Sequence, residues 1–202
     1  MAASRQLGLV AGALALGCGG ATPAASVAQP SAPATGPLRY LPLEDGTVFS
    51  YETATTPGND RGLLVLEVRR PRPDTAEFVV AGRVTRLSIT PESVAHAGGG
   101  FLLHAPLVAG AEWHGDFGHV RLTRVDARVT VGAGTFADCL ETVEELATRE
   151  ADKRTTTTFC AGVGIALRET EVEQGGEHQS ERIALKSFGK RFDASHASTP
   201  SD

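Results

Sequence analysis

An antiparallel all-β domain is the fold class that the sequence predicts, and three observations lead to it. Runs such as Thr47–Thr55 and His119–Val131 alternate apolar and polar side chains, which is typical of strands buried on one face. Turn signals rich in glycine separate such runs at short intervals, which favours hairpins between neighbouring strands. Two cysteines, Cys139 and Cys160, are spaced so that they can join two adjacent strands.

The first half of the domain contains predicted strands bounded by strong turn signals. Glu44-Asp45-Gly46 leads into Thr47–Thr55, and Thr56-Pro57-Gly58-Asn59-Asp60 separates that run from the next. Pro71 and Pro73 end the following run because proline has no amide hydrogen for a strand ladder. The further predicted strands include a hairpin about Ala81-Gly82 and two short pieces: Gly62–Arg70, Thr75–Val80, Arg83–Thr90, Ser93–Ala97 and Phe101–His104.

The second half begins with Pro106–Phe117, which contains the only tryptophan. We expect Trp113 to be half-buried and to cover one end of the core. The alternation of His119–Val131 slips near Thr123–Val125, which indicates a bulge or bend. Two alternating runs, Ile165–Glu173 and His178–Phe188, flank a Gln-Gly-Gly turn and predict a hairpin.

The segment Asp138–Arg149 is compatible with two structures. Asp138 and Glu141 have the spacing of a helix capping box, and apolar residues follow at helical intervals, so its own residues favour a helix. A strand is the alternative, because Cys139 must reach Cys160 and the threonine-rich run before Cys160 strongly favours β structure.

The start of the chain resembles a bacterial lipoprotein signal. Arg5 precedes the apolar run Leu7–Leu16, which is too short to span a bilayer as a helix, and small residues surround Cys18. In such signals the chain is cut before the cysteine, which is acylated and becomes the new N-terminus. Cleavage after Ala28 is the alternative, and both routes export the protein.

Four segments follow from this interpretation. Residues 1–17 are the predicted signal peptide, and residues 18–37 are a flexible acylated tether without charge or aromatic side chains. Residues 38–192 form one β domain, and residues 193–202 are a disordered tail.

The cysteine count supports export and predicts a disulfide. Acylation of Cys18 leaves Cys139 and Cys160 as a pair, and disulfides persist in oxidising compartments. The alternative is two unrelated buried thiols. The pair would close a loop of about twenty residues and stabilise the fold by about 3 kcal/mol in the chain-entropy model.

The charge distribution and the glycines exclude several functions. The formal net charge is −5, and no basic surface for nucleic acid is expected. Two glycine pairs, Gly132 with Gly134 and Gly162 with Gly164, lack the strand-to-helix context of phosphate loops. We expect these glycines to supply positive φ angles in turns.

Catalytic chemistry finds little support in the sequence. His114, Asp116 and His119 could bind zinc, but a third strong ligand at matching spacing is missing, so exposed loop histidines are the better interpretation. The acidic residues Glu141, Glu144 and Glu145 are interpreted as a solvated strand face. No nucleophile elbow surrounds the serines. We therefore expect no enzyme, no metal and no cofactor.

Several short motifs resemble a family of uncharacterised bacterial cell-envelope lipoproteins. They lie near Tyr40–Tyr51, at Pro106–Trp113 and at Val129–Cys139, and they end with Phe159-Cys160-Ala161-Gly162-Val163-Gly164. Family members often carry Tyr-Ala-Pro-Gly-Val-Gly at that last motif, so an aromatic residue and a proline differ. The resemblance implies a single curved antiparallel sheet or half-open barrel, here of about 9–11 strands. It favours a strand over Cys139–Arg149 and brings no catalytic residues.

The functions that follow are those of an envelope protein. We expect an anchor through Cys18 in a membrane facing the periplasm, with the outer membrane favoured over simple secretion. The leading hypothesis is a non-enzymatic binding or structural module for an apolar ligand or an envelope protein. A carrier of lipid or lipoprotein and a metal-dependent enzyme using His114, Asp116 and His119 are the alternatives.

Overall fold

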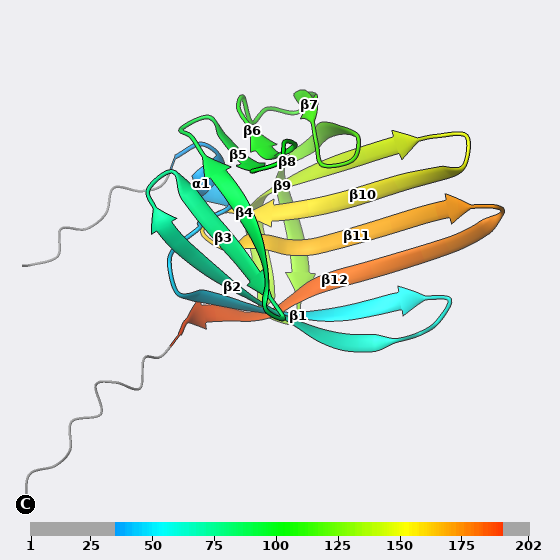
Figure 1. The fold of residues 1–202 in the computed structure, drawn as a ribbon, viewed down its shortest axis with the longest axis horizontal. Coiled ribbons are helices and arrows are strands. Elements are labelled where there is room, and N and C mark those ends of the chain that lie inside the picture. The colour runs from blue at the N-terminus through cyan, green and yellow to red at the C-terminus, as the bar shows by residue number, and fades with distance from the viewer. Residues whose placement is uncertain (1–34, 192–202) are drawn as a thin grey trace, which may run out of the picture. The chain divides into compact units, whose positions relative to one another are not determined.

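The computed structural model describes residues 35–191, in which one antiparallel sheet of twelve strands follows a short helix (Figure 1). The strand order is β6-β5-β4-β3-β2-β1-β12-β11-β10-β9-β8-β7, and the sheet curves into a nearly closed barrel. The elements are α1 (Pro37–Tyr40), β1 (Thr47–Thr56), β2 (Arg61–Arg72), β3 (Thr75–Val80), β4 (Arg83–Ile89), β5 (Ser93–His96), β6 (Phe101–His104), β7 (Glu112–His114), β8 (His119–Val131), β9 (Gly134–Ala147), β10 (Ala151–Cys160), β11 (Gly164–Gln174) and β12 (Glu177–Lys190).

The predicted all-β class and the antiparallel sheet are confirmed. The sheet contains one strand more than the upper end of the predicted range, because β7 forms inside a segment that has too short an alternating pattern to be recognised. Both predicted hairpins, β3–β4 about Ala81-Gly82 and β11–β12 about Gly175-Gly176, are present.

The segment that could be helix or strand is a strand, so the helix favoured by its own residues is wrong. β9 is paired on both sides, with β8 through Glu144↔Val120 and with β10 through Glu144↔Thr155. Alternation along β9 directs Leu140, Thr142 and Glu144 into the curve of the sheet, and we call this side the inner face. Tertiary pairing therefore overrides the local helical spacing.

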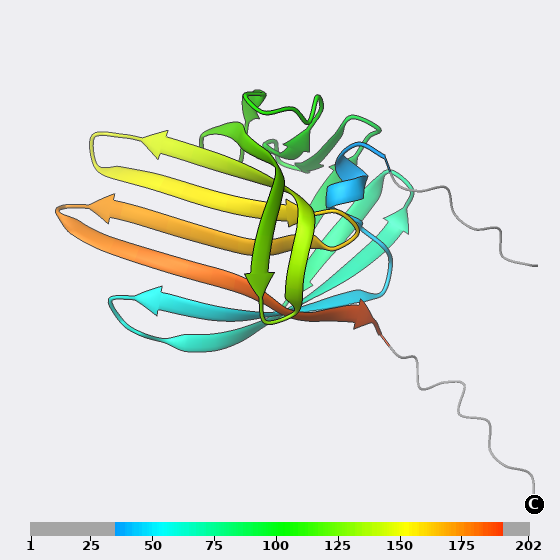
Figure 2. The same cartoon turned by 180° about the vertical axis from the view of Figure 1, so that it is seen from behind.

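The hairpin of β8 and β9 bends sharply after its first half. The register shifts between Leu122 and Val129, and Asp126 and Asp138 have positive φ angles of 57° and 55°. The predicted bulge in β8 is confirmed. Beyond the bend the hairpin crosses the back of β11 and β12 (Figure 2), where the Ala133 amide donates to the Leu185 carbonyl at 3.0 Å.

One apolar core fills the inner face near α1. Its largest buried side chains include Phe159, Leu140, Leu122 and Leu185. Pro37, which the composition placed in the tether, is buried and begins α1, so the folded part starts earlier than predicted. The predicted signal peptide, the other tether residues before Thr35 and the tail from Asp193 lie outside the described residues.

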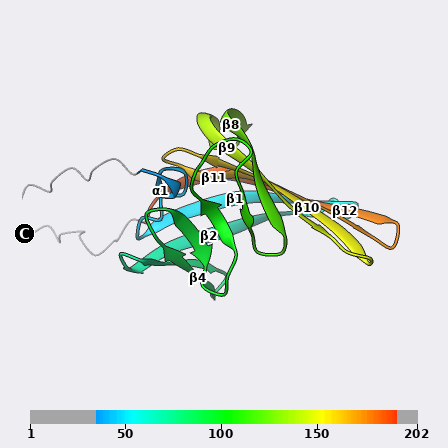
Figure 3. The ribbon, with the colours of Figure 1, turned by 90° about the horizontal axis from the view of Figure 1, so that it is seen from above.

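The hairpins on the other side extend beyond this core. Figure 3 shows the tips of β10–β12 projecting past the curve formed by β2–β4 and β8–β9. Their ends are rich in exposed charged residues, such as Glu150 and Glu177. This part of the sheet is stabilised mainly by its backbone ladders.

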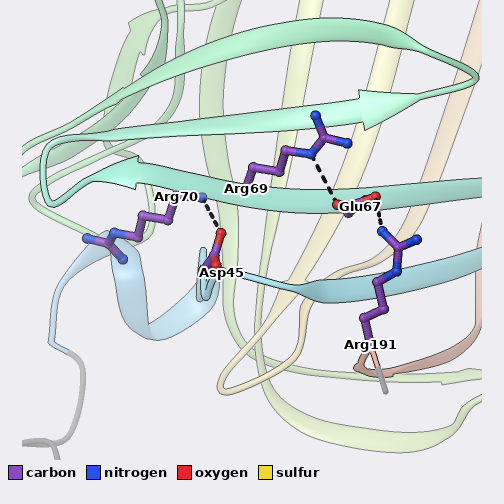
Figure 4. A network of polar contacts seen from close by, with 5 residues as sticks. All are labelled: Asp45, Glu67, Arg69, Arg70 and Arg191. Atoms are coloured by element: carbon purple, nitrogen blue, oxygen red, sulfur yellow. Dashed lines mark hydrogen bonds and ion pairs between the residues drawn. The ribbon is translucent and has the colours of Figure 1, made fainter. Parts of the chain in front are cut away.

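A polar network joins the end of β12 to β2 (Figure 4). The Glu67 carboxylate accepts hydrogen bonds from Arg69 Nε at 3.1 Å and from Arg191 Nη1 at 3.3 Å. Nearby, the amide of Arg70 donates to Asp45 Oδ1 at 2.7 Å. Because the two arginines paired with Glu67 are at least half exposed, each ion pair contributes at most about 1 kcal/mol.

Candidate functional site

The two edges of the sheet, β6 and β7, meet at a seam that has no continuous backbone ladder. Trp113 of β7 bridges it, because its indole Nε1–H donates to the Phe101 carbonyl of β6 at 3.1 Å. The side chain is only 7% exposed, so it is buried, not half-buried as predicted. The backbone approaches closely here, since a Cβ on Gly100 would lie 2.7 Å from the Gly115 carbonyl oxygen.

A cluster of charged side chains lies beside this seam, and we call it the seam cluster: His96, Asp116, Glu144, Lys153 and Arg168. His96 Nε2 of β5 is 2.9 Å from Asp116 Oδ2 in the β7–β8 turn. Glu144 of β9 accepts hydrogen bonds from the amides of Phe117 at 2.8 Å and Gly118 at 3.0 Å. The cluster therefore links β5 and the β7–β8 turn, which lie next to the seam, to the inner face of β9.

Burial raises the pKa of Asp116, and the Glu144 carboxylate adds to that increase. The positive charges of His96, Arg168 and Lys153 act in the opposite direction and are outweighed. Lys153 also lies over the ring of Phe117, 3.8 Å from its centroid, in a cation–π contact. The cluster thus combines two acids with three bases, and at Asp116 burial outweighs the neighbouring positive charges.

The space left on the inner face is small. About 30 Å³ remains between Asp116, Glu144, Arg168 and the side chains around them, enough for about one or two water molecules. Three buried threonines line it, Thr142, Thr155 and Thr157. Cavities that hold small molecules measure about 300–1,000 Å³, so this one is too small for such a ligand.

Larger clefts open on the surface at the hairpin tips. One of about 320 Å³ lies beside Leu146, Lys153 and Glu171, and its lining is strongly charged. Throughout the described part of the chain, every buried side-chain nitrogen or oxygen has a hydrogen-bond partner. The interior therefore offers no unused polar group to a ligand.

The three residues considered for zinc are not brought together as a metal site. His119 Nε2 is 3.0 Å from Glu112 Oε2, whereas Asp116 pairs with His96. Hydrogen bonds from His119 and from Arg121 lower the pKa of Glu112. Among residues 35–191, no group of three or more His, Cys, Asp or Glu side chains could hold a metal ion.

Cys139 and Cys160 occupy directly paired positions in β9 and β10. Their sulfur atoms are at disulfide distance, 2.06 Å, and both side chains are fully buried. Alternation places them on the face opposite to that of Leu140 and Phe159. Cys18, the predicted lipidation site, lies outside the described residues.

Three of the four turn glycines have the expected backbone. Gly134, Gly162 and Gly164 have positive φ angles of 134°, 71° and 106°. Gly132 does not, and the expectation is wrong there. Its role is close approach, because a Cβ at Gly132 would lie 3.4 Å from Lys186 Cα where the hairpin crosses β12.

Four members of the seam cluster were not singled out as site residues from the sequence. Glu144 was grouped with Glu141 and Glu145 on a solvated face, but strand alternation separates it from both and turns it inward. The alternation that turns Glu144 inward can be applied only once β9 is known to be a strand. His96, Lys153 and Arg168 come from three different strands, and no sequence spacing relates them.

No helix in the part of the chain that the structure covers has the length and hydropathy needed to cross a membrane.

The chain matches no protein-family model and no curated protein. Two solved structures are similar in fold. One, from Bacteroides fragilis, is of a presumed exported protein with a YmcC-like fold; its TM-score is 0.48 at 12% identity, over 75% of this chain and 99% of that one. The other, of a presumed lipoprotein from Parabacteroides distasonis, has a TM-score of 0.46 at 11% identity, over 74% and 98%.

Proposed function

We propose that this chain is a cell-envelope protein anchored to a membrane by an acyl group on Cys18, and that its β domain is a non-enzymatic module that binds another envelope protein or has a structural role. The filled inner face carries this proposal. A protein that carries lipid needs a large apolar cavity, whereas the cavity beside the seam cluster measures about 30 Å³ and includes Asp116, Glu144 and Arg168 in its lining.

The export part of the proposal is supported by the leader and the cysteines. The apolar run before Cys18 has the length of a secretory signal. The two remaining cysteines lie at disulfide distance, which suits an oxidising compartment.

Metabolic labelling with a palmitate analogue tests the anchor. The full chain, expressed in a bacterial host that acylates lipoproteins, should take up the label and fractionate with membranes. Cys18→Ser should lose the label and appear in the soluble fraction. Mass spectrometry of the mature N-terminus separates the alternatives, because a chain that begins at Gln29 would show cleavage after Ala28 and refute the anchor.

Native mass spectrometry tests the nature of the module. The Cys18→Ser variant removes the proposed acyl group, so any lipid found with it must be held by the β domain. We expect none. A lipid bound at one per chain would refute the module interpretation and support a carrier, and stoichiometric zinc in the same sample would support an enzyme.

A further inference from the structure

The outer edge of β2 is unpaired over its first five residues. β1 pairs with β2 down to Arg61, whereas β3 pairs with it only from Leu66 onward, through Leu66↔Val80. Within residues 35–191 no other strand lies along Arg61–Val65. Figure 1 shows why: β3 and β4 turn away while the β1–β2 hairpin continues outward.

The backbone of this edge is available for hydrogen bonds. The Thr55 amide donates to the Asp60 carbonyl at 3.0 Å, which marks that pair as hydrogen-bonded. Because hydrogen-bonded pairs alternate along an antiparallel ladder, Gly62 and Leu64 bond to β1. The amides and carbonyls of Arg61, Leu63 and Val65 therefore point away from β1, toward the open side.

The side chains at the edge are apolar and exposed. Leu63 is 61% exposed and Val65 is 47% exposed, and alternation places both on the outer face. Proteins commonly protect such edges with proline, lysine or a bulge. Arg61–Val65 contains no proline or lysine, and its pairing with β1 has no register shift.

We propose that Arg61–Val65 is a pairing site for a second copy of this chain, joined edge to edge in an antiparallel arrangement centred on Leu63. This register places Leu63 opposite Leu63 of the second copy and Arg61 opposite Val65. The segment has a single charge, Arg61. In this register Arg61 lies opposite an apolar residue of the second copy, so the two arginines do not face each other. The edge is thus complementary to itself, as a two-fold interface requires.

The pairing of β2 with β3 limits the length of this register. The register ends where β3 takes over at Leu66, beside the small β3–β4 turn of Ala81-Gly82. A Cβ on Gly82 would meet nothing within 4 Å. Five paired residues bury far less than the roughly 1,600 Å² of a standard interface, so the association is weak in dilute solution. The local concentration on a membrane would favour it, and only this point rests on the proposed Cys18 anchor.

Site-specific photo-crosslinking in intact cells tests the proposal. The full-length chain carries a photoreactive amino acid at position 63, and two differently tagged copies are expressed together. We expect a crosslinked product containing both tags. Val108, which is 55% exposed in the connection between β6 and β7, is the matched control position and should give none.

A second variant controls for proximity by chance. With the photoreactive residue at position 65, Leu63→Lys places two lysines opposite each other, and the homodimer yield should fall to the Val108 level. Circular dichroism should be unchanged because the side chain is exposed. Crosslinks at 63 that reach only other proteins, no crosslink at all, or a yield unaffected by Leu63→Lys would each refute self-pairing. Fractionation of the same cells tests the anchor separately, so that loss of the anchor and loss of self-pairing are distinguished.

Discussion

Asp116 shows at the residue scale how burial and ion pairing compete. The His96 imidazole lies 2.9 Å away, yet burial has the larger effect and raises the pKa of the Asp116 carboxyl. The folded state therefore holds this proton more tightly than the unfolded state does. The resulting stability is fully present below the ordinary pKa of 3.8 and is lost as the pH rises through the raised value.

Asp116→Asn is expected to raise stability at neutral pH despite breaking the contact with His96, because the variant buries no ionised carboxylate. The advantage should shrink as the pH falls from about 7 to about 4, where the wild-type group takes up its proton. Urea unfolding across this range measures it, with the exposed Glu92→Gln as control. A variant less stable than wild type at pH 7 would mean that the His96 pair outweighs burial.

Gly118 in the β7–β8 turn determines how closely this turn packs against β9. A Cβ on Gly118 would lie 2.0 Å from the Glu145 carbonyl oxygen, and the Gly118 amide donates to Glu144. The turn can therefore pack against β9 only if this position lacks a side chain. Gly98, by contrast, has nothing within 4 Å of its would-be Cβ.

Gly118→Ala should lower the free energy of unfolding by about 1–3 kcal/mol, the usual range for forced overpacking. Gly98→Ala, the matched control, should change it by less than about 0.5 kcal/mol. Chemical denaturation of both variants gives the comparison. Equal effects would show that the turn does not need its close approach to β9.

At the element scale, β9 and β10 are held together by their ladder and by the cysteine pair. Local pattern alone favoured a helix for Asp138–Arg149, because Leu140, Val143 and Leu146 fall at helical spacing. The structure reverses this, since a strand can pair on both sides with β8 and β10. The intrinsic helix propensity of a segment is a weak influence, and backbone hydrogen bonds to strands on both sides override it.

Replacing both cysteines, Cys139→Ala with Cys160→Ala, should lower the free energy of unfolding by about 3 kcal/mol, because the crosslink closes a loop with a sequence separation of 21. Far-ultraviolet circular dichroism should still show the sheet, since the β9–β10 ladder remains. Denaturant unfolding of the oxidised wild type, the reduced wild type and the variant measures the effect. A reduced wild type as stable as the oxidised protein would contradict the loop-entropy explanation.

Closure of the seam is a property of the whole sheet. The first and last strands in the spatial order, β6 and β7, meet through Trp113, with no backbone ladder between them. The His96–Asp116 contact adds a link between β5 and the β7–β8 turn. Both edges are short, and each is covered by the other. Away from the seam, the outer edge of β2 is left open over Arg61–Val65.

Trp113→Phe keeps an aromatic ring at the seam but removes the donor to the Phe101 carbonyl. We expect a loss of about 1–2 kcal/mol and faster hydrogen exchange in β6 and β7 than in β1. Exchange measured by mass spectrometry locates the change, with Val108→Ala as the control in the same connection. Uniformly faster exchange over the whole sheet would argue against a local seam.

The sequence by itself determined the alternating strands and the hairpin turns, because these depend on neighbouring residues. It also determined the pairing partner available to Cys139, because that follows from the number of cysteines. Only the tertiary structure decided that β9 is a strand, that Glu144 turns inward to the seam cluster, and that Arg61–Val65 has no paired strand on its outer side. These features depend on which strands meet and where each ladder stops. Register and curvature are properties of the complete sheet, and no local pattern in the chain encodes them.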